Sequence, residues 1–208
     1  MNGTRVILLR HGETVWNLEG RYQGQLDSPL TPAGEAQARA LAQRLVGMKF
    51  SALYTSDLGR ARQTAGFIAQ SSGHELRVEA QLRERHLGIF QNLRKAELKL
   101  KFPNEYRLFK SGGPEHVIPQ GESTRQAADR TNACLEELAR RHAAETIVIV
   151  AHGGTISALL RHALGIPLDA PRRFERSNAS WNVFQFDDGK WFLETWGDVS
   201  HLENAACH

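Results

Sequence analysis

Apolar and polar positions along this chain form two kinds of segment. In the first kind, apolar residues follow one another almost without interruption, which is typical of parallel strands buried on both faces. In the second kind, apolar residues recur every three or four positions, which is typical of an amphipathic helix. The predicted strands are 5–9, 51–54 and 146–150, and the predicted helices, caps included, are 31–47, 58–70, 123–143 and 155–164. This alternation predicts an α/β fold of three layers, with helices on both faces of a mostly parallel central sheet.

Two local signals in this pattern are specific. Thr31 is a predicted N-cap, Pro32 suits the first position of the helix, and Gly47 suits its end. Near the carboxyl terminus, residues 181–196 have the pattern of two strands joined at Asp188-Gly189. An Asp-Gly pair between two strands is typical of a type I′ turn, so we expect a hairpin there.

Segment 92–121 differs from the rest of the chain. It begins with a helical pattern and continues with proline and glycine, which interrupt regular structure. We expect a lid insertion that covers one edge of the sheet within a single domain, 1–208. Its basic residues would attract an anionic substrate or form a solvated helix face; they are Arg94, Lys95, Lys99, Lys101, Arg107 and Lys110.

Length and composition narrow the class of protein. The chain has 208 residues, which suits one domain, and its net charge of +3 does not indicate a nucleic-acid surface but is compatible with a small anionic ligand. Cys134 and Cys207 form no disulfide framework, and the nine histidines show no metal-ligand spacing. No apolar run approaches the roughly 20 residues of a membrane helix. We expect a cytoplasmic protein that needs no metal or other cofactor, and a homodimer stays open.

Two of the predicted strands are followed, after one intervening residue, by the same dipeptide, His-Gly. The stretch "VILLRHGET" contains His11-Gly12, and "VIVAHGGT" contains His152-Gly153. In open parallel sheets, ligands bind in the crevice outside the carboxyl ends of the strands. If these two strands are neighbours, both histidines face one crevice, and the glycine after each histidine lets the backbone come close to a ligand.

Arginines accompany these histidines. Arg10 precedes His11, and Arg60 lies at the start of the helix that follows strand 51–54. A planar guanidinium group can donate two hydrogen bonds to a tetrahedral oxyanion, and nearby helix N-termini add backbone N–H donors. The cluster therefore predicts a binding site for a phosphoryl group.

An ordered series of motifs also gives the chain a family resemblance. The series is "RHGETVWN", "GRYQGQLDSPLTPAGEAQA", "YTSDLGRARQTA", "LRERHLG", "GES", "VAHGG" and "GDVSHL". It spans nearly the whole length and resembles the histidine phosphatase superfamily, the phosphoglycerate mutase-like proteins. The resemblance implies a phosphoglycerate mutase-like fold and an enzyme that transfers a phosphoryl group without a metal.

The resemblance implies a role for each matching position. His11 would be the nucleophile that forms a phosphohistidine, and Arg10 and Arg60 would bind the phosphate oxygens. His152 would donate a hydrogen bond to the transferring group. Glu84 would be the general acid that protonates the leaving oxygen and then the base for water. The substrate-binding residues would include Asn17, Gln23, Gly24 and Gly153.

Three positions leave alternatives open. His86, in "LRERHLG", would contact the substrate or pack beneath the lid. His201, in the closing "GDVSHL", would return to the mouth of the pocket or pack elsewhere. Gln91-Asn92 stands where many relatives have Glu-Gly, a departure that concerns the edge of the lid rather than the catalytic centre.

The same kind of site carries out two reactions in this superfamily. A phosphatase lets water attack the phosphohistidine, whereas a mutase returns the group to a bound sugar acid. "ERHLG" and Lys95–Glu97 resemble the mutase branch, whereas the compact length, "GRYQGQLDSPLT" and "GDVSHL" resemble the phosphatase branch. We predict a phosphomonoesterase that acts on a small phosphorylated metabolite. The alternatives are a phosphoglycerate mutase and a catalytically silent phospho-ligand-binding module.

Overall fold

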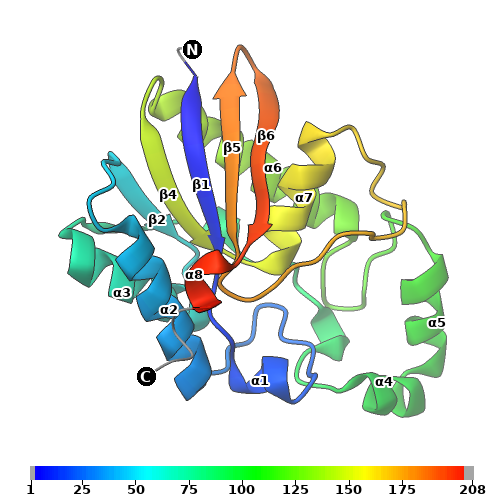
Figure 1. The fold of residues 1–208 in the computed structure, drawn as a ribbon. Helices are drawn as coiled ribbons and strands as arrows, with labels where there is room; N and C mark the ends of the chain where they lie inside the picture. Colours follow the sequence, from blue (N-terminus) through cyan, green and yellow to red (C-terminus); the bar gives the residue numbers. More distant parts are fainter. Residues whose placement is uncertain (1–2, 204–208) are drawn as a thin grey trace.

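The computed structural model describes residues 3–203, and its central feature is one β-sheet (Figure 1). Six strands of this range hydrogen-bond in the order β3-β2-β4-β1-β5-β6. The first four of these pair in parallel, whereas β5 pairs antiparallel with both β1 and β6. The strands are β1 (Thr4–Arg10), β2 (Ala52–Thr55), β3 (Leu76–Val78), β4 (Thr146–Ala151), β5 (Trp181–Asp187) and β6 (Lys190–Asp198). The predicted mostly parallel sheet is confirmed.

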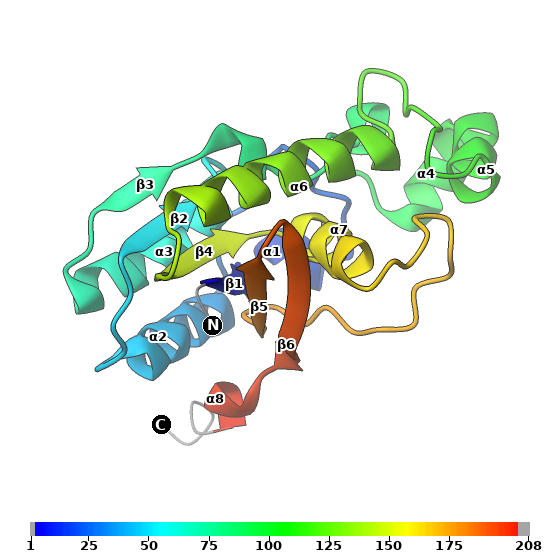
Figure 2. The ribbon, with the colours of Figure 1, turned by 90° about the horizontal axis from the view of Figure 1, so that it is seen from above.

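Helices cover both faces of this sheet, so the three-layer arrangement is also confirmed (Figure 2). One face carries α2 (Pro32–Leu45) and α3 (Gly59–Ser72), and the other carries α6 (Thr124–Arg141) and α7 (Gly153–Ala163). The shorter helices are α1 (Val15–Leu18), α4 (Lys95–Lys101), α5 (Pro103–Ser111) and α8 (Ser200–Glu203), and the 3-10 turns are η1 (Ala80–Leu82) and η2 (Gly88–Phe90).

The apolar run of β1 is continuous because both faces of this strand are buried. Val6 and Leu8 point into the apolar layer beneath α6 and α7, and Ile7 and Leu9 point into the layer beneath α2 and α3. All four side chains are 0% exposed. Successive side chains of a strand point to opposite faces, so a central strand needs apolar residues at every position.

The predicted cap and hairpin are both present. The Thr31 hydroxyl accepts a hydrogen bond from the Gly34 N–H at 2.9 Å, and Pro32 is the first residue of α2. Between β5 and β6, Asp188 and Gly189 have φ angles of +46° and +73°. Two successive positive φ angles define the turn that suits the twist of a hairpin, which explains why an Asp-Gly pair stands there.

Strand β3 was not predicted from the sequence. It contains three residues, and two of them, Arg77 and Val78, are exposed. So short an edge strand shows no periodicity of two, and its place in the sheet comes from parallel pairing with β2.

Segment 92–121 lies elsewhere than predicted. It contains α4 and α5, which lie apart from the edge strands β3 and β6 (Figures 1 and 2). Its apolar residues surround Phe90, whose ring centroid is 5.4 Å from that of Phe109. The prediction of a sheet-edge cover is therefore wrong, because these side chains pack on the loops around the carboxyl ends of the strands.

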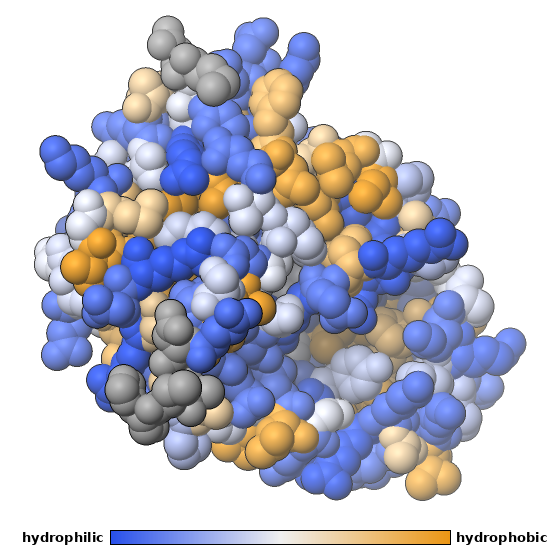
Figure 3. All heavy atoms as spheres, viewed as in Figure 1, coloured by the Kyte–Doolittle hydropathy of each residue, from blue (hydrophilic) through white to orange (hydrophobic). Residues whose placement is uncertain are grey.

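The molecular surface is mixed in character. On the face seen in Figure 3, hydrophilic residues cover most of the surface and apolar residues gather in separate patches. None of the helices described between residues 3 and 203 combines the length and apolar character needed to cross a membrane. Cys134 is buried in α6, and Cys207 lies outside the described residues.

Candidate active site

A cavity of about 420 Å³ opens at the carboxyl ends of the parallel strands. The pairing of β1 with β4 sets Arg10 opposite Ala151, so the next residue of each strand, His11 and His152, lies beside the other. Their ring centroids are 5.3 Å apart. The expectation that both histidines face one crevice holds because β1 and β4 are neighbours.

The hydrogen bond that His11 makes selects one tautomer. Its Nδ1 lies 2.8 Å from the carbonyl oxygen of Gly12, and a carbonyl can only accept, so Nδ1 carries the proton. The lone pair of the neutral ring then lies on Nε2. Burial, together with the charges of Arg60 and Arg10, holds the pKa of His11 well below its usual value. The ring is therefore neutral at physiological pH and carries a nucleophilic nitrogen.

His152 is fully buried at the start of α7. Burial, and then the charges of Arg60 and His11, hold its pKa well below the usual value. Among the described residues, neither ring nitrogen has a hydrogen-bond partner. A buried polar atom without a partner is costly, so an anion bound beside His11 could accept the free N–H of this ring.

The Arg60 side chain is only 1% exposed, and polar contacts hold its guanidinium in place. Its guanidinium donates to the carbonyls of Gly24 at 2.7 Å and Leu26 at 2.8 Å, and it pairs with Asp27 at 3.0 Å. Burial lowers the pKa of Arg60, yet the pairing with Asp27 favours its charged form. These contacts come from the 23–27 loop and orient the guanidinium beside the two histidines.

Arg10 occupies the other side of the site. It donates to the backbone carbonyl of Arg176. Burial, together with the charge of Arg176, lowers the pKa of Arg10 to about 10, so its guanidinium stays protonated near pH 7. Both predicted arginines thus line the cavity together with His11.

Glu84 reaches the cavity from the loop that follows β3 and η1. Its carboxylate accepts the N–H of Gly154 at 2.9 Å and that of Arg85 at 2.8 Å. A Cβ atom at position 154 would collide with this carboxylate where it now lies, so glycine lets Glu84 lie against the first turn of α7. The second glycine of "VAHGG" therefore makes room for Glu84.

Glycine serves another purpose after the first histidine. A Cβ atom at Gly12 would collide with the backbone carbonyl of Gly34 in α2. Gly12 therefore allows a close approach between two segments of backbone, and a close approach to a ligand stays a prediction. The amide of Gly12 is occupied too, because it donates to the Thr64 hydroxyl at 3.0 Å.

The structure places the other predicted site residues as follows. Asn17, Gln23 and Gly24 line the cavity. Gly153 does not line it but lies against the Arg10 guanidinium.

The two histidines left open by the sequence lie outside the cavity lining. His86 directs Nδ1 to the Gly88 N–H at 3.0 Å, within its own loop. His201 lies in α8, where its Nδ1 is 3.2 Å from the Arg44 guanidinium. Both contacts are structural in kind.

Sequence reasoning missed two residues that come from the loop before β5. The Asn178 side-chain amide donates to the carbonyls of His11 at 3.1 Å and Gly12 at 3.2 Å, and Arg176 lines the cavity. Because β5 runs antiparallel to β1, its amino end lies at the carboxyl end of β1. The signal was the hairpin pattern itself: a strand antiparallel to β1 brings its preceding residues to the site.

The two buried histidines make a prediction about stability. Each is neutral when folded and has a pKa near 6.5 when unfolded, so below that pH the unfolded chain binds more protons than the folded one. The unfolding free energy should fall as the pH falls below about 6.5, by up to about 1.4 kcal/mol per pH unit for each histidine. Urea unfolding in phosphate-free buffer at several pH values measures this slope.

Two matched variants test whether the buried histidines cause this pH dependence of the unfolding free energy. His152→Gln removes one buried titrating ring and should flatten the dependence, whereas His162→Gln removes an exposed histidine of the same helix and should not. Equal slopes in wild type and His152→Gln would refute the assignment.

Within residues 3–203, no group of three or more histidine, cysteine, aspartate or glutamate side chains is arranged to hold a metal ion.

The fold and the cavity together define a class of protein. It is an α/β protein in which a neutral histidine at a strand end faces buried arginines and a carboxylate, an arrangement suited to binding a phosphoryl group. A family comparison agrees with this class, because the model of the histidine phosphatase superfamily (branch 1) matches residues 6–199. The chain belongs to the histidine phosphatase superfamily.

Similar proteins carry both activities in their names. Phosphoglycerate mutase-like protein 4 of Arabidopsis thaliana is 42% identical over 203 residues, which are 95% of this chain and 86% of that protein. The mycobacterial glucosyl-3-phosphoglycerate phosphatase is 33% identical with a TM-score of 0.82, covering 93% of this chain and 98% of its own. Phosphoserine phosphatase of Entamoeba histolytica, solved with 3-phosphoglyceric acid, is 31% identical with a TM-score of 0.85, covering 96% and 99%.

Proposed function

We propose that this protein is a phosphomonoesterase that hydrolyses a small phosphorylated metabolite through a phosphohistidine on His11. One observation carries the proposal: the Nδ1–H of His11 is bound to a carbonyl, which leaves the lone pair on Nε2 beside Arg10 and Arg60. Phosphatases of small phosphorylated metabolites among the similar structures support the same reaction.

The first half of the reaction transfers the phosphoryl group to the enzyme. Nε2 of His11 attacks phosphorus, a P–N bond forms, and the P–O bond to the alcohol breaks. Glu84 acts as the general acid and gives a proton to the leaving oxygen, so that an alcohol rather than an alkoxide departs.

The second half returns the enzyme to its starting state. Water attacks the phosphohistidine, the P–N bond breaks, and the electron pair returns to Nε2. Glu84 accepts the proton of the attacking water and is protonated again. Inorganic phosphate is released.

Charge stabilisation is the task of the surrounding residues. The transferring group spreads negative charge over three oxygens, and catalysis consists mostly of positioning and electrostatic stabilisation. Arg10 and Arg60 supply two guanidinium groups held in place before the substrate binds, and His152 can supply a third donor. Asn17, Gln23 and Gly24 complete the proposed phosphate pocket.

Phosphoglycerate mutase is the second candidate, because the relative from Arabidopsis thaliana is named as mutase-like. A paired assay separates the two reactions. It follows phosphate release from a panel of phosphomonoesters, and conversion of 3- to 2-phosphoglycerate with and without the bisphosphorylated primer. Phosphate release with little isomerisation supports the phosphatase, and fast primer-dependent isomerisation with negligible release supports the mutase. Absence of both reactions, and of a trapped phosphoenzyme, would support a silent binding module.

A further inference from the structure

The cavity contains more positive charge than one phosphate group requires. Within the described part of the chain, eight arginines and a single acidic residue, Glu84, line it. The arginines are Arg10, Arg21, Arg60, Arg83, Arg85, Arg161, Arg172 and Arg176. The proposed phosphate site uses two of them, Arg10 and Arg60, and the others surround the space where the rest of a substrate would lie.

Carboxylates of the protein already neutralise some of this charge. Arg21 pairs with Glu19 at 2.6 Å, and Arg83 pairs with Asp57. Arg161 donates instead to the carbonyls of Pro167 and Ala170. Its guanidinium therefore holds the loop after α7 in place. These three arginines have structural explanations.

Arg176 has no such explanation. In residues 3–203 it forms no ion pair with a carboxylate, and its Nε is buried without a hydrogen-bond partner. Its side-chain contact is a long one, 3.5 Å from Nη1 to the Ser157 hydroxyl. Burial lowers the pKa of Arg176, and the charge of Glu84 opposes that shift without forming an ion pair with the guanidinium.

Arg176 also lies next to the proposed phosphate site. The Arg10 guanidinium carbon and Nη1 of Arg176 are both 3.6 Å from the point where a Cβ of Gly153 would stand. Two guanidinium groups this close repel each other unless anions lie between or beside them. A group that Arg176 binds must therefore be a near neighbour of the phosphate that Arg10 binds.

We infer that Arg176 binds a second anionic group of the substrate, so that the substrate class is a phosphomonoester with a carboxylate a few bonds from the ester oxygen. The inference rests on the proposed phosphatase function and deepens it. A carboxylate fits because it can accept two parallel hydrogen bonds from one guanidinium. Arg176 would thus be a specificity-determining residue.

The test compares two substrates that differ in this group: 3-phosphoglycerate and glycerol phosphate, in which a hydroxymethyl group replaces the carboxylate. We expect the wild type to favour 3-phosphoglycerate in kcat/KM by at least about tenfold. Arg176→Gln keeps the backbone carbonyl that Arg10 uses and should move this ratio towards one. Arg173→Gln, an equal change of charge at an exposed arginine outside the cavity lining, should keep the ratio of the wild type.

A binding measurement separates failure of this inference from failure of the proposed function. Titration calorimetry in a His11→Ala background compares the affinities of the same two compounds without turnover. Tighter binding of 3-phosphoglycerate that Arg176→Gln abolishes supports the subsite even if no phosphatase activity is found. Equal affinities for the two compounds, or a preference that Arg176→Gln leaves unchanged, would overturn the inference.

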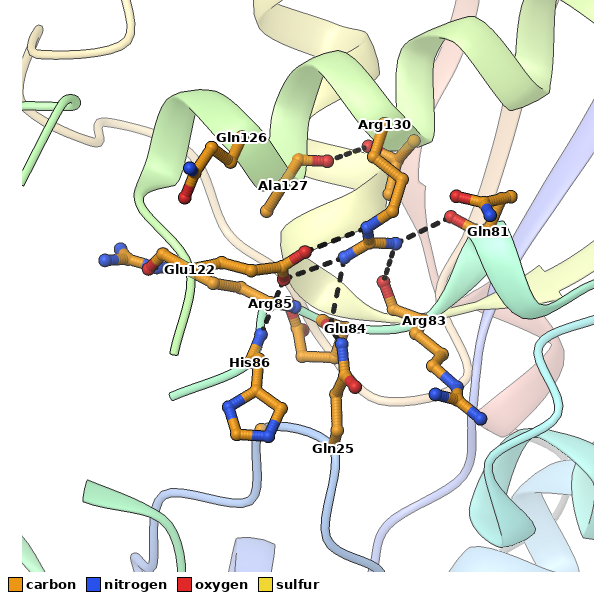
Figure 4. A network of polar contacts seen from close by, with 12 residues as sticks. Gln25, Gln81, Arg83, Glu84, Arg85, His86, Glu122, Gln126, Ala127 and Arg130 are labelled. Atoms are coloured by element: carbon orange, nitrogen blue, oxygen red, sulfur yellow. Dashed lines mark hydrogen bonds and ion pairs between the residues drawn. The ribbon is translucent and has the colours of Figure 1, made fainter. Parts of the chain in front are cut away.

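A second observation concerns the loop that carries Glu84. Figure 4 shows Arg130 of α6 directed at the backbone of this loop. Its guanidinium donates to the carbonyls of Gln81 at 2.7 Å, Arg83 at 3.1 Å and Glu84 at 3.5 Å. The Arg130 side chain thus binds the backbone carbonyl of Glu84 and those of two residues that precede Glu84 in the loop.

Glu122, from the "GES" motif, secures the other side of the same loop. Its carboxylate forms two contacts with Arg130, at 3.0 and 2.9 Å, and accepts the N–H of His86 at 2.8 Å (Figure 4). The Arg130 and Glu122 side chains are 19% and 23% exposed. Neither lines the cavity, so neither can contact the substrate from these positions.

The geometry points to the Arg130–Glu122 pair as a positioning device for Glu84, whose side chain lines the cavity together with His11. Its effect should therefore depend on how much the reaction needs a general acid. Glycerol phosphate releases an alkoxide and needs the proton, whereas p-nitrophenyl phosphate releases a phenolate that leaves readily without one.

The test measures kcat/KM, which reports the steps up to alcohol release. Arg130→Gln should reduce kcat/KM by at least about tenfold for glycerol phosphate and by a clearly smaller factor for p-nitrophenyl phosphate. Arg125→Gln, which removes an exposed arginine one turn earlier in α6, is the matched control. Equal losses on both substrates, or no loss on either, would overturn the positioning role.

Discussion

Replacing His11 with alanine is expected to lower kcat for phosphate release by at least about 10⁴-fold, as removal of a catalytic nucleophile does elsewhere. His11 lines the described cavity with its neutral Nε2 available to attack, whereas the neighbouring His152 is also neutral but does not line that cavity. Phosphate release from the best substrate of the panel measures the effect, and acid-quenched trapping of labelled phosphoenzyme measures the intermediate.

The matched control is His162→Gln, which removes an exposed histidine of α7. It should keep wild-type turnover and phosphoenzyme. Circular dichroism of His11→Ala should show an unchanged fold, since the change removes one ring at a cavity. Turnover of His11→Ala within tenfold of the wild type would eliminate the phosphohistidine mechanism.

Glu84→Gln is expected to have the second largest effect. The amide keeps the shape of the side chain but cannot give up or take a proton as a carboxyl does. We expect kcat/KM for alkyl phosphates to fall by roughly 10²- to 10⁴-fold, the range typical of general acid–base catalysis. The loss for p-nitrophenyl phosphate should be much smaller, because its leaving group needs no proton.

An exposed glutamate in the same part of the chain provides the control. Glu75→Gln makes the same chemical change just before β3 and should leave both substrates unaffected. If Glu84→Gln reduced kcat/KM equally for both substrates, Glu84 would not be the general acid. The smaller, substrate-selective decrease in kcat/KM expected for Arg130→Gln depends on the same role of Glu84. Equal losses in Glu84→Gln would therefore remove the basis for that expectation too.

The sequence alone predicted the parts of the fold that depend on neighbouring residues. The uninterrupted apolar run of β1, the Thr31 cap and the Asp188-Gly189 turn are all local signals, and each lies where it was expected. The two His-Gly strand ends could be assigned to one crevice because parallel strands share a direction. Glu84 was found through its motif, since a glutamate in a loop has no pattern of its own.

Residues that meet across long stretches of chain could not be predicted in this way. Arg176 reaches the site because β5 pairs antiparallel with β1, and Arg130 binds carbonyls that precede it by 46 to 49 residues. The position of α4 and α5 in the fold is set by packing around Phe90, and no pattern within segment 92–121 predicts it.

The physical reason for this division is the range of the interactions involved. Periodicity, caps and turns express contacts between residues a few positions apart, so they can be recognised in the sequence itself. The place of Gly154 beside Glu84, and of Arg176 beside Arg10 with its buried Nε unpartnered in the described residues, depends on which surfaces pack together once the layers form. The strand ends and their chemistry were therefore predictable from the sequence, whereas the second anion subsite and the support of the general acid became visible in the folded chain alone.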